Sequence, residues 1–250
     1  MSTPHSRNTW PGFDQRINNP TYIDTATYFD LAADRVRKID ELIKQSRPTS
    51  ILDIGYFPGL IGRRIKEMHP DIHLVGIGKS NGAAAKAVGY DEIHDAEFDP
   101  FYGVVSIPRI DRKFDLILGC EIIEHLIQPK PFLSFIADSL SDNGSTLITT
   151  PNVSSFGAIG RLLKGKSNYE ALKHSVIMLN NDWRAHVRLY DRSELIELGR
   201  MFGLHCTEHR YYRNSAMDHE KAKGATWLLR STFSAIPTYR EDQYAVFQRA

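Results

Sequence analysis

Apolar residues in this chain follow two spacings that alternate along the sequence. Short apolar runs, such as SILDI at 50–54 and FDLILGC at 114–120, have the length and composition of buried strands. Between such runs apolar residues recur every three or four positions, as in LIGRRIKEMHP at 60–70, which is the spacing of a helix with one buried face. The alternation predicts an α/β fold with a parallel, doubly wound sheet.

The same spacings place further elements along the chain. Apolar positions from Tyr28 to Gln45 fall near helical spacing, and Arg47-Pro48 ends this amphipathic helix. A regular amphipathic helix that begins near Asp191 is expected to end at Gly203. Strands are also expected at 71–78, 90–100, 204–212 and 243–250, and a short helix at 81–89.

Two segments differ from this regular pattern. Residues 1–27 are polar and interrupted by prolines, so we expect residues 1–47 to form an arm and a helix that either pack on the sheet edge or cover a ligand site. Residues 152–185 have no strong period and follow an expected strand, which favours a lid over a substrate pocket. The α/β domain itself would span residues 48–250, with this lid as an insertion.

The lid also has an excess of basic over acidic residues. This excess fits either a site for a phosphate or carboxylate or a solvated basic face, and the sequence leaves both open. The basic residues are Arg161, Lys164, Lys166, Lys173 and Arg184, against Glu170 and Asp182.

Charge and cysteine content limit the classes of partner and the cellular compartment that we expect for this protein. With 31 basic and 30 acidic residues the formal net charge is +1, so no global field demands a nucleic acid or an anionic membrane. Cys120 and Cys206 form neither a disulfide framework nor a CxxC metal motif, which fits a reducing compartment. No stretch has eighteen apolar residues, and the amino terminus lacks the apolar run of a signal peptide. We therefore expect a soluble, cytoplasmic protein.

A glycine-rich turn follows the first expected strand. Asp53 ends the apolar run, and Gly55 and Gly59 then precede a helix. Strand, glycine turn and helix in this order aim backbone N–H groups and a helix amino terminus at a ligand. The alternative is an ordinary tight turn between a strand and a helix.

Two carboxylates and an imidazole follow the strand at 114–120. Glu121, Glu124 and His125 are spaced i, i+3 and i+4, so one helical turn would place them on one face. Oxygen and imidazole ligands suit Mg²⁺, Mn²⁺ or Zn²⁺, and a fourth ligand is expected from His186. The alternatives are a solvated helix start for Glu124 and His125, and a histidine that caps or packs near the next helix for His186.

The order of these motifs resembles that of class I S-adenosylmethionine-dependent methyltransferases from about Ile51 to Leu204. ILDIGYFPG is similar to the first motif of that family, FDLILGCEIIEHL to the fourth-strand motif, and SLSDNGSTLITTPN to the segment that leads into the fifth strand. The resemblance implies a Rossmann-like, mostly parallel seven-stranded sheet with helices on both faces. It also implies a cofactor site made by Asp53, Gly55, Tyr56, Gly59, Gly78, Lys79, Asp95, Ala96 and Cys120.

The resemblance assigns parts of the cofactor to these residues. Asp53, Gly55 and Gly59 would shape the pocket for the methionine part, Asp95 and Ala96 would flank the adenine, and Cys120 would line the pocket after the fourth strand. Two positions depart from the family pattern. Phe57 stands where a glycine is usual, and Gly78 stands where an acidic residue usually holds the ribose hydroxyls. Cofactor affinity is then either modest, rebuilt by neighbours such as Lys79, or lost in a catalytically silent relative.

A subset of that family shares the ExxEH motif with a later histidine. In this chain the residues are Glu121, Glu124, His125 and His186, and the pattern resembles both ubiquinone-pathway O-methyltransferases and small-RNA 3′-end 2′-O-methyltransferases. By that resemblance the cation binds substrate hydroxyls, because coordination lowers the hydroxyl pKa and positions the oxygen. His125 and Glu124 would be the catalytic residues.

Together these patterns predict a cofactor-dependent O-methyltransferase that acts on a hydroxyl of a small molecule and uses a divalent cation. A catechol, a hydroquinone or a sugar is the favoured substrate class, because two neighbouring oxygens can chelate one ion. RNA is the enzymatic alternative; the near-neutral charge and the lack of an RNA-binding appendage disfavour it. A silent module that binds a partner protein is the non-enzymatic alternative. Calorimetry with S-adenosylmethionine separates the classes, since a silent module should not bind it.

Overall fold

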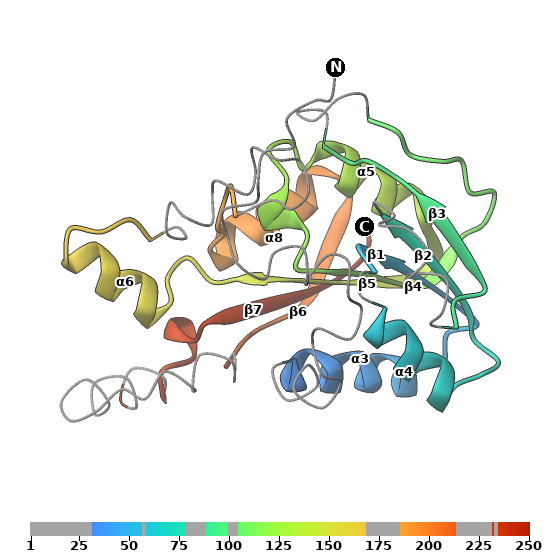
Figure 1. Cartoon of the computed structure of the whole chain (residues 1–250), viewed down its shortest axis with the longest axis horizontal. Helices are drawn as coiled ribbons and strands as arrows, with labels where there is room; N and C mark the ends of the chain where they lie inside the picture. Colours follow the sequence, from blue (N-terminus) through green and yellow to red (C-terminus); the bar gives the residue numbers. More distant parts are fainter. Residues whose placement is uncertain are drawn as a thin grey trace, which may run out of the picture.

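Seven strands form one sheet at the centre of the molecule (Figure 1). The computed structural model describes residues 32–56, 59–78, 89–99, 105–168, 186–213, 232 and 235–250. The strands are β1 (Ser50–Ile54), β2 (His73–Gly78), β3 (Glu92–Asp95), β4 (Phe114–Cys120), β5 (Leu140–Pro151), β6 (Leu204–Tyr212) and β7 (Asp242–Arg249). Their order across the sheet is β3-β2-β1-β4-β5-β7-β6.

The strand directions confirm the mostly parallel, doubly wound sheet. β1 pairs in parallel with β2 and β4, β2 with β3, and β4 with β5, whereas β7 is antiparallel to both β5 and β6. β6 therefore runs in the same direction as β5. As a result the carboxyl ends of β1 to β6 lie at one edge of the sheet, where ligands bind in folds of this type.

Helices cover both faces of the sheet, as Figure 1 shows. α3 (Ala33–Ser46) and α4 (Leu60–Met68) pack on one face, and α5 (Lys130–Ser139) and α8 (Arg192–Met201) on the other. The two faces correspond to two apolar clusters, one with Ile39, Leu42 and Ile65 from the first pair of helices and one with Phe132 and Leu195 from the second pair. The helix-period apolar positions of the sequence are thus the ones that the sheet buries.

The ends of these helices follow from local chemistry. α3 ends at Arg47, whose φ of 48° is left-handed, and Pro48 cannot continue the helix. Asp191 caps α8 by accepting from the backbone N–H of Glu194, while the Glu194 side chain accepts from the N–H of Asp191. Met68, the last residue of α4, is 50% exposed, whereas Leu60 and Ile65 on the same helix are buried.

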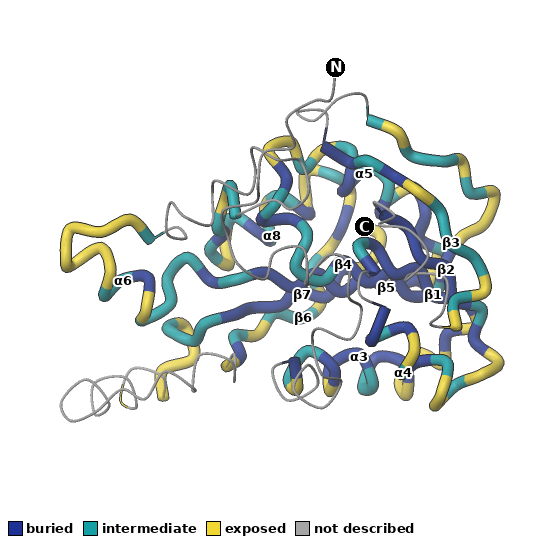
Figure 2. The backbone as a smooth tube through the Cα atoms, in the orientation of Figure 1, coloured by how far each residue is buried: buried dark blue, intermediate teal, exposed yellow. Residues whose placement is uncertain are grey.

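The predicted lid contains a helix that the sequence analysis did not identify. α6 (Phe156–Leu163) begins at Ser155, whose side chain accepts from the N–H of Ala158. It extends beyond the end of the sheet, and Figure 2 shows that much of it is exposed. Our predictions for residues 1–31, 57–58, 79–88 and 169–185 fall outside the described residues. Across the part of the chain that is described, no helix has the length and apolar character needed to span a membrane.

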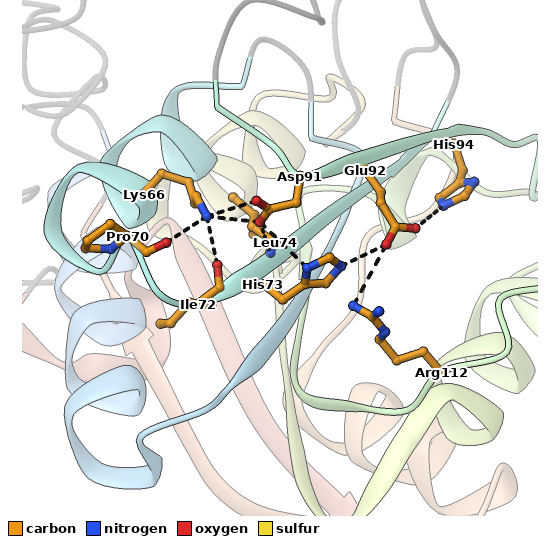
Figure 3. A network of polar contacts seen from close by, with 9 residues as sticks. All are labelled: Lys66, Pro70, Ile72, His73, Leu74, Asp91, Glu92, His94 and Arg112. Atoms are coloured by element: carbon orange, nitrogen blue, oxygen red, sulfur yellow. Dashed lines mark hydrogen bonds and ion pairs between the residues drawn. The ribbon is translucent and has the colours of Figure 1, made fainter.

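A polar network joins α4 to the β2–β3 edge of the sheet (Figure 3). The Lys66 ammonium donates to two backbone carbonyls and to the carboxylate of Asp91, at 3.0 Å to one oxygen. The two oxygens of Glu92 lie 2.9 Å and 3.3 Å from Nε2 of His73 and His94. These contacts anchor the short edge strand β3, whose carboxyl end reaches the ligand-binding edge.

Candidate functional site

The glycine turn after β1 has the backbone conformation that a close ligand approach requires. Gly55 has a φ of 74° and donates its N–H to the carbonyl of Ile77, and Gly59 has a φ of 86° at the amino terminus of α4. Left-handed backbone of this kind favours glycine. The amino end of α4 and the turn therefore face the carboxyl edge of the sheet together, which is the arrangement predicted for a cofactor.

Asp53, at the end of β1, is buried next to this turn. Its Oδ2 accepts a hydrogen bond from the Tyr90 hydroxyl at 2.6 Å. Burial raises the pKa of Asp53 to about 7, although the Tyr90 hydrogen bond and the charge of Arg35 oppose this rise. A cationic group bound here would favour the ionised carboxylate. The site is thus suited to the positive end of a ligand.

The candidate adenosine residues lie at the ends of β2 and β3. Gly78 pairs with Asp95 in register, and the N–H of Ala96 donates to the carbonyl of Gly78 at 3.0 Å. A Cβ atom on Gly78 would lie 3.4 Å from the backbone of Gly55. The structure therefore brings Gly78, Asp95 and Ala96 together, while Lys79 lies outside the described residues.

Restoring an acid at position 78 tests whether a ribose faces it. We expect Gly78→Asp to tighten binding of S-adenosylhomocysteine about tenfold, because a carboxylate that accepts from two hydroxyls adds about 1.5–3 kcal/mol. A Cβ at this position would make an ordinary contact with Gly55. Isothermal titration calorimetry measures the change. A weaker affinity would mean that this chain holds the ribose in another way.

The segment after β4 differs from the predicted helical turn. Glu121 has a φ of 57°, and a 3₁₀ turn, η3 (Ile123–His125), follows it. The carboxylate of Glu121 therefore does not point the way that a helical turn would direct it. Its Oε1 lies 3.3 Å from Arg35 and accepts a hydrogen bond from the Thr149 hydroxyl at 2.7 Å. Burial raises the pKa of the neighbouring Cys120 thiol to about 12, so this thiol is neutral at the end of β4.

Three of the four predicted metal ligands come together. One ligand atom from each of Glu124, His125 and His186 lies within 4.8 Å of the other two, and the two rings are 4.9 Å apart. Glu124 is fully buried; its Oε2 accepts from Thr150, but its Oε1 has no hydrogen-bond partner among the described residues. A buried carboxylate oxygen without a donor is costly unless a ligand completes it.

His186 reaches the cluster through backbone contacts with η3. The carbonyl of Glu124 accepts the N–H groups of Val187 at 2.8 Å and Arg188 at 3.2 Å. Further along, Asn152 and Tyr190 form an isolated parallel bridge. These contacts hold the segment that contains His186 against the ends of β4 and β5, although it is distant from both in the sequence.

The electrostatics of the cluster fit a cation. Burial raises the pKa of Glu124 well above its ordinary range, and the charges of Glu121 and Asp242 raise it further. Burial lowers the pKa of His186, which keeps its imidazole neutral and able to ligate. One carboxylate and two imidazoles form a common catalytic ligand set for Zn²⁺ and also suit Mn²⁺. The donor atoms present therefore fit a divalent cation.

The structure adds residues that the sequence analysis did not identify as part of the site. Arg35 on α3 pairs with Glu121, and its charge also acts on Asp53 and Cys120. A signal for it exists in the sequence, because Arg35 lies four positions before Ile39, on the buried face of α3. Tyr90 shows no such signal: the sequence predicts it as the first residue of a strand at 90–100, whereas in the structure it precedes β3.

Comparisons with known proteins agree with this geometry. A model of the family described as "Methyltransferase domain" matches residues 27–209. The ubiquinone biosynthesis O-methyltransferase of Bradyrhizobium diazoefficiens is 33% identical over 104 residues, which are 41% of this chain and 40% of that protein. The mitochondrial enzyme of that name in Schizosaccharomyces pombe is 24% identical over 101 residues, or 40% and 37% of the two chains. The match thus spans about two fifths of each curated relative.

A solved structure shares the fold over a longer stretch. The N-methyltransferase NodS from Bradyrhizobium japonicum WM9, solved with S-adenosyl-L-homocysteine, superposes with a TM-score of 0.53 over 94% of this chain and 97% of that chain, at 13% identity. The sheet order, the glycine turn after β1 and the family match lead to one conclusion. This chain belongs to the methyltransferase domain family, among the class I S-adenosylmethionine-dependent methyltransferases.

Proposed function

We propose that the protein transfers the methyl group of S-adenosylmethionine to a hydroxyl oxygen of a small molecule, with a divalent cation held by Glu124, His125 and His186. The observation that carries the proposal is the buried Oε1 of Glu124, which has no hydrogen-bond partner among the described residues and lies 3.8 Å from Nε2 of His125, in a residue that clusters with His125 and His186. The partial similarity to two ubiquinone biosynthesis O-methyltransferases supports oxygen as the acceptor.

The chain's own groups have separate tasks in this reaction. The turn at Gly55 and the buried acid Asp53 would hold the cofactor, which supplies the methyl group to be transferred. A divalent cation at the cluster supplies Lewis acidity that lowers the pKa of the substrate hydroxyl. Three protein ligands leave coordination positions for substrate oxygens. Neighbouring oxygens, as in a catechol, would fill two of them.

The bond changes are those of a direct displacement. The substrate oxygen attacks the methyl carbon, the carbon–sulfur bond breaks, and S-adenosylhomocysteine leaves as a neutral thioether. The hydroxyl proton passes to solvent or to an imidazole of the site. If no cation takes part, His125 is the nearest general base in the described site, because an imidazole titrates near neutral pH.

Glu121 remains a proposed fourth ligand. Its Oε1 is bound by Arg35 and Thr149, yet its charge acts on both Glu124 and His186. We propose that Glu121 contributes charge to the cation site and approaches it when a ligand engages Arg35. The arm and helix before β1 are the proposed cover of the same site, because α3 carries Arg35 to it.

Metal binding and transfer can be measured with one pair of proteins. The expected result is that Mn²⁺ or Zn²⁺ stabilises the wild-type protein by about 2.7 kcal/mol at 100 times Kd, and that Glu124→Gln removes this stabilisation. The substitution keeps the side chain's size but removes the charge that binds a cation. Differential scanning fluorimetry measures the stabilisation by metal in the wild-type protein and in Glu124→Gln. Transfer of labelled methyl to 3,4-dihydroxybenzoate, before and after EDTA treatment, measures whether the reaction needs the cation.

The matched control is Glu97→Gln, which lies outside the cluster on the β3 side of the sheet. It should keep the metal-induced shift. Full transfer by EDTA-treated protein would remove the cation from the mechanism and leave His125 as the base. Labelling of an amine probe in place of the dihydroxy probe would show that nitrogen, and not oxygen, is the acceptor.

A further inference from the structure

Two consecutive threonines near the end of β5 hold the two carboxylates of the ExxEH motif. The Thr149 hydroxyl donates to Oε1 of Glu121 at 2.7 Å, and the Thr150 hydroxyl donates to Oε2 of Glu124 at 3.0 Å. Both threonines are fully buried. Valine would suit a buried strand equally well and would not bury a hydroxyl. The two hydroxyls are therefore explained by the carboxylates that they bind, and not by the strand.

The two threonines point to opposite faces of the sheet, because side chains alternate along a strand. Leu147 belongs to the apolar cluster that contains residues of α3, and Ile148 belongs to the cluster that contains residues of α5. By this alternation Thr149 lies on the α3 face and Thr150 lies on the α5 face. The two carboxylates of the motif are thus held on opposite sides of β5.

The hydrogen bond from Thr150 distinguishes the two oxygens of Glu124. Oε2 accepts from the threonine, whereas Oε1 is buried, has no hydrogen-bond partner among the described residues and lies 3.8 Å from Nε2 of His125. One ligand atom of Glu124 lies within 4.8 Å of one from His125 and one from His186. A cation in this cluster is therefore expected at Oε1, the oxygen that no donor occupies.

The number of oxygens that Glu124 offers decides how much of the cation is left for a substrate. A carboxylate that binds through both oxygens takes two coordination positions, whereas one that binds through a single oxygen takes one. With one carboxylate oxygen and two imidazoles, the protein fills three positions and leaves the others open. Neighbouring oxygens of a dihydroxy compound can then occupy the open positions.

We propose that Thr150 is the positioning residue of the cation site, and that its hydroxyl restricts Glu124 to one-oxygen coordination through Oε1. The inference rests on the proposed function, because it needs a cation between Glu124 and the two histidines. A group that hydrogen-bonds a metal ligand fixes the ligand's orientation and typically raises metal affinity by about 10–100-fold. Thr150 acts through Glu124, since its hydroxyl is bound to that carboxylate.

Thr150→Val tests the proposal, because it removes the hydroxyl and keeps the shape of the side chain. We expect isothermal titration with ZnCl₂ to show binding at least about tenfold weaker than in wild type, since the carboxylate is no longer held. Thr150→Ser returns a hydroxyl to this position and should recover most of the lost affinity. A side chain that only packs would show no such rescue, because serine fills less space than valine.

Thr146→Val is the matched control. Thr146 lies on the same strand and, at an even spacing from Thr150, on the same face; it is also fully buried. Its hydroxyl has no hydrogen-bond partner among the described residues, so its loss should leave Zn²⁺ affinity unchanged. Equal affinities of Thr150→Val and wild type would overturn the proposal. An equal loss in Thr146→Val, or no recovery in Thr150→Ser, would do the same, because the hydroxyl at position 150 would then not be the cause.

The wild-type protein provides a second measurement that depends on no variant. A crystal structure with bound Zn²⁺ should show Oε1 of Glu124 on the ion and Oε2 still bound by the Thr150 hydroxyl. Coordination through both oxygens would show that Thr150 does not restrict the carboxylate. A wild-type protein that binds no Zn²⁺ in the titration would instead contradict the proposed function.

Discussion

His186→Ala will reduce methyl transfer about 100-fold or more while the protein still binds S-adenosylhomocysteine. The imidazole is one of three groups whose ligand atoms converge within 4.8 Å, and its removal leaves two ligands for the cation. Several kcal/mol of transition-state stabilisation then disappear, and each 1.4 kcal/mol is about a factor of ten in rate. The proposed glycine turn and adenosine residues lie at the ends of β1, β2 and β3, so we expect this substitution to leave them unaffected. Steady-state kinetics and metal analysis of the purified variant measure both effects.

His209→Ala is the control for this substitution. His209 is also a half-buried histidine, but it lies on β6 and its Nε2 contacts Gln243 at 3.0 Å. Its loss should lower stability and leave metal content and transfer unchanged. Full activity and full metal content in His186→Ala would show that this histidine packs against η3 without binding a cation.

Gly55→Val should abolish cofactor binding and lower the stability of the fold. A Cβ at this position would lie 2.0 Å from Cδ1 of Ile122, and the φ of 74° is unfavourable for any residue with a Cβ. The backbone strain alone costs about 1–2 kcal/mol, and the clash with Ile122 adds to it. Calorimetry with S-adenosylhomocysteine and chemical denaturation measure the two consequences.

A substitution at a second glycine, Gly203, shows how much of the effect of Gly55→Val comes from backbone strain alone. Gly203 has a φ of 72°, and a Cβ added there would meet no atom of the described residues within 4 Å, so Gly203→Val carries the strain without the clash. It should lose some stability and keep cofactor affinity. If Gly55→Val fails to fold, the pair Gly55→Ala with Ile122→Ala relieves the contact. Wild-type affinity in that pair would place the cofactor away from this turn.

The strands could be predicted from the sequence because their apolar runs are short and continuous. SILDI coincides with β1, and FDLILGC coincides with β4. The helical spacing of apolar residues at 60–70 likewise predicted α4 (Leu60–Met68), because a helix that packs on a sheet must be apolar on one face. α6 was not predicted, although Phe156, Ile159 and Leu163 fall at helical spacing, because a helix of only eight residues gives a short pattern within a long irregular segment.

The identity of the candidate ligands was contained in the sequence, but their arrangement was not. Glu121, Glu124 and His125 were expected on one helical turn, whereas the left-handed φ of Glu121 and the 3₁₀ turn direct its carboxylate toward Arg35. The choice between helix and turn is made by neighbours such as Thr149, which holds the Glu121 carboxylate. Local propensity does not include such partners.

The sequence by itself determined the alternation of strands and helices, the glycine turn after β1 and the residue types of the site, because these depend on periodicity and on local backbone preferences. The tertiary structure alone decided which side chains meet. Arg35 and Glu121 are separated by scores of residues, and the packing of α3 on the sheet brings their side chains to 3.3 Å of each other. Their proximity follows from burial of apolar faces across the sheet, a long-range effect that no local pattern encodes.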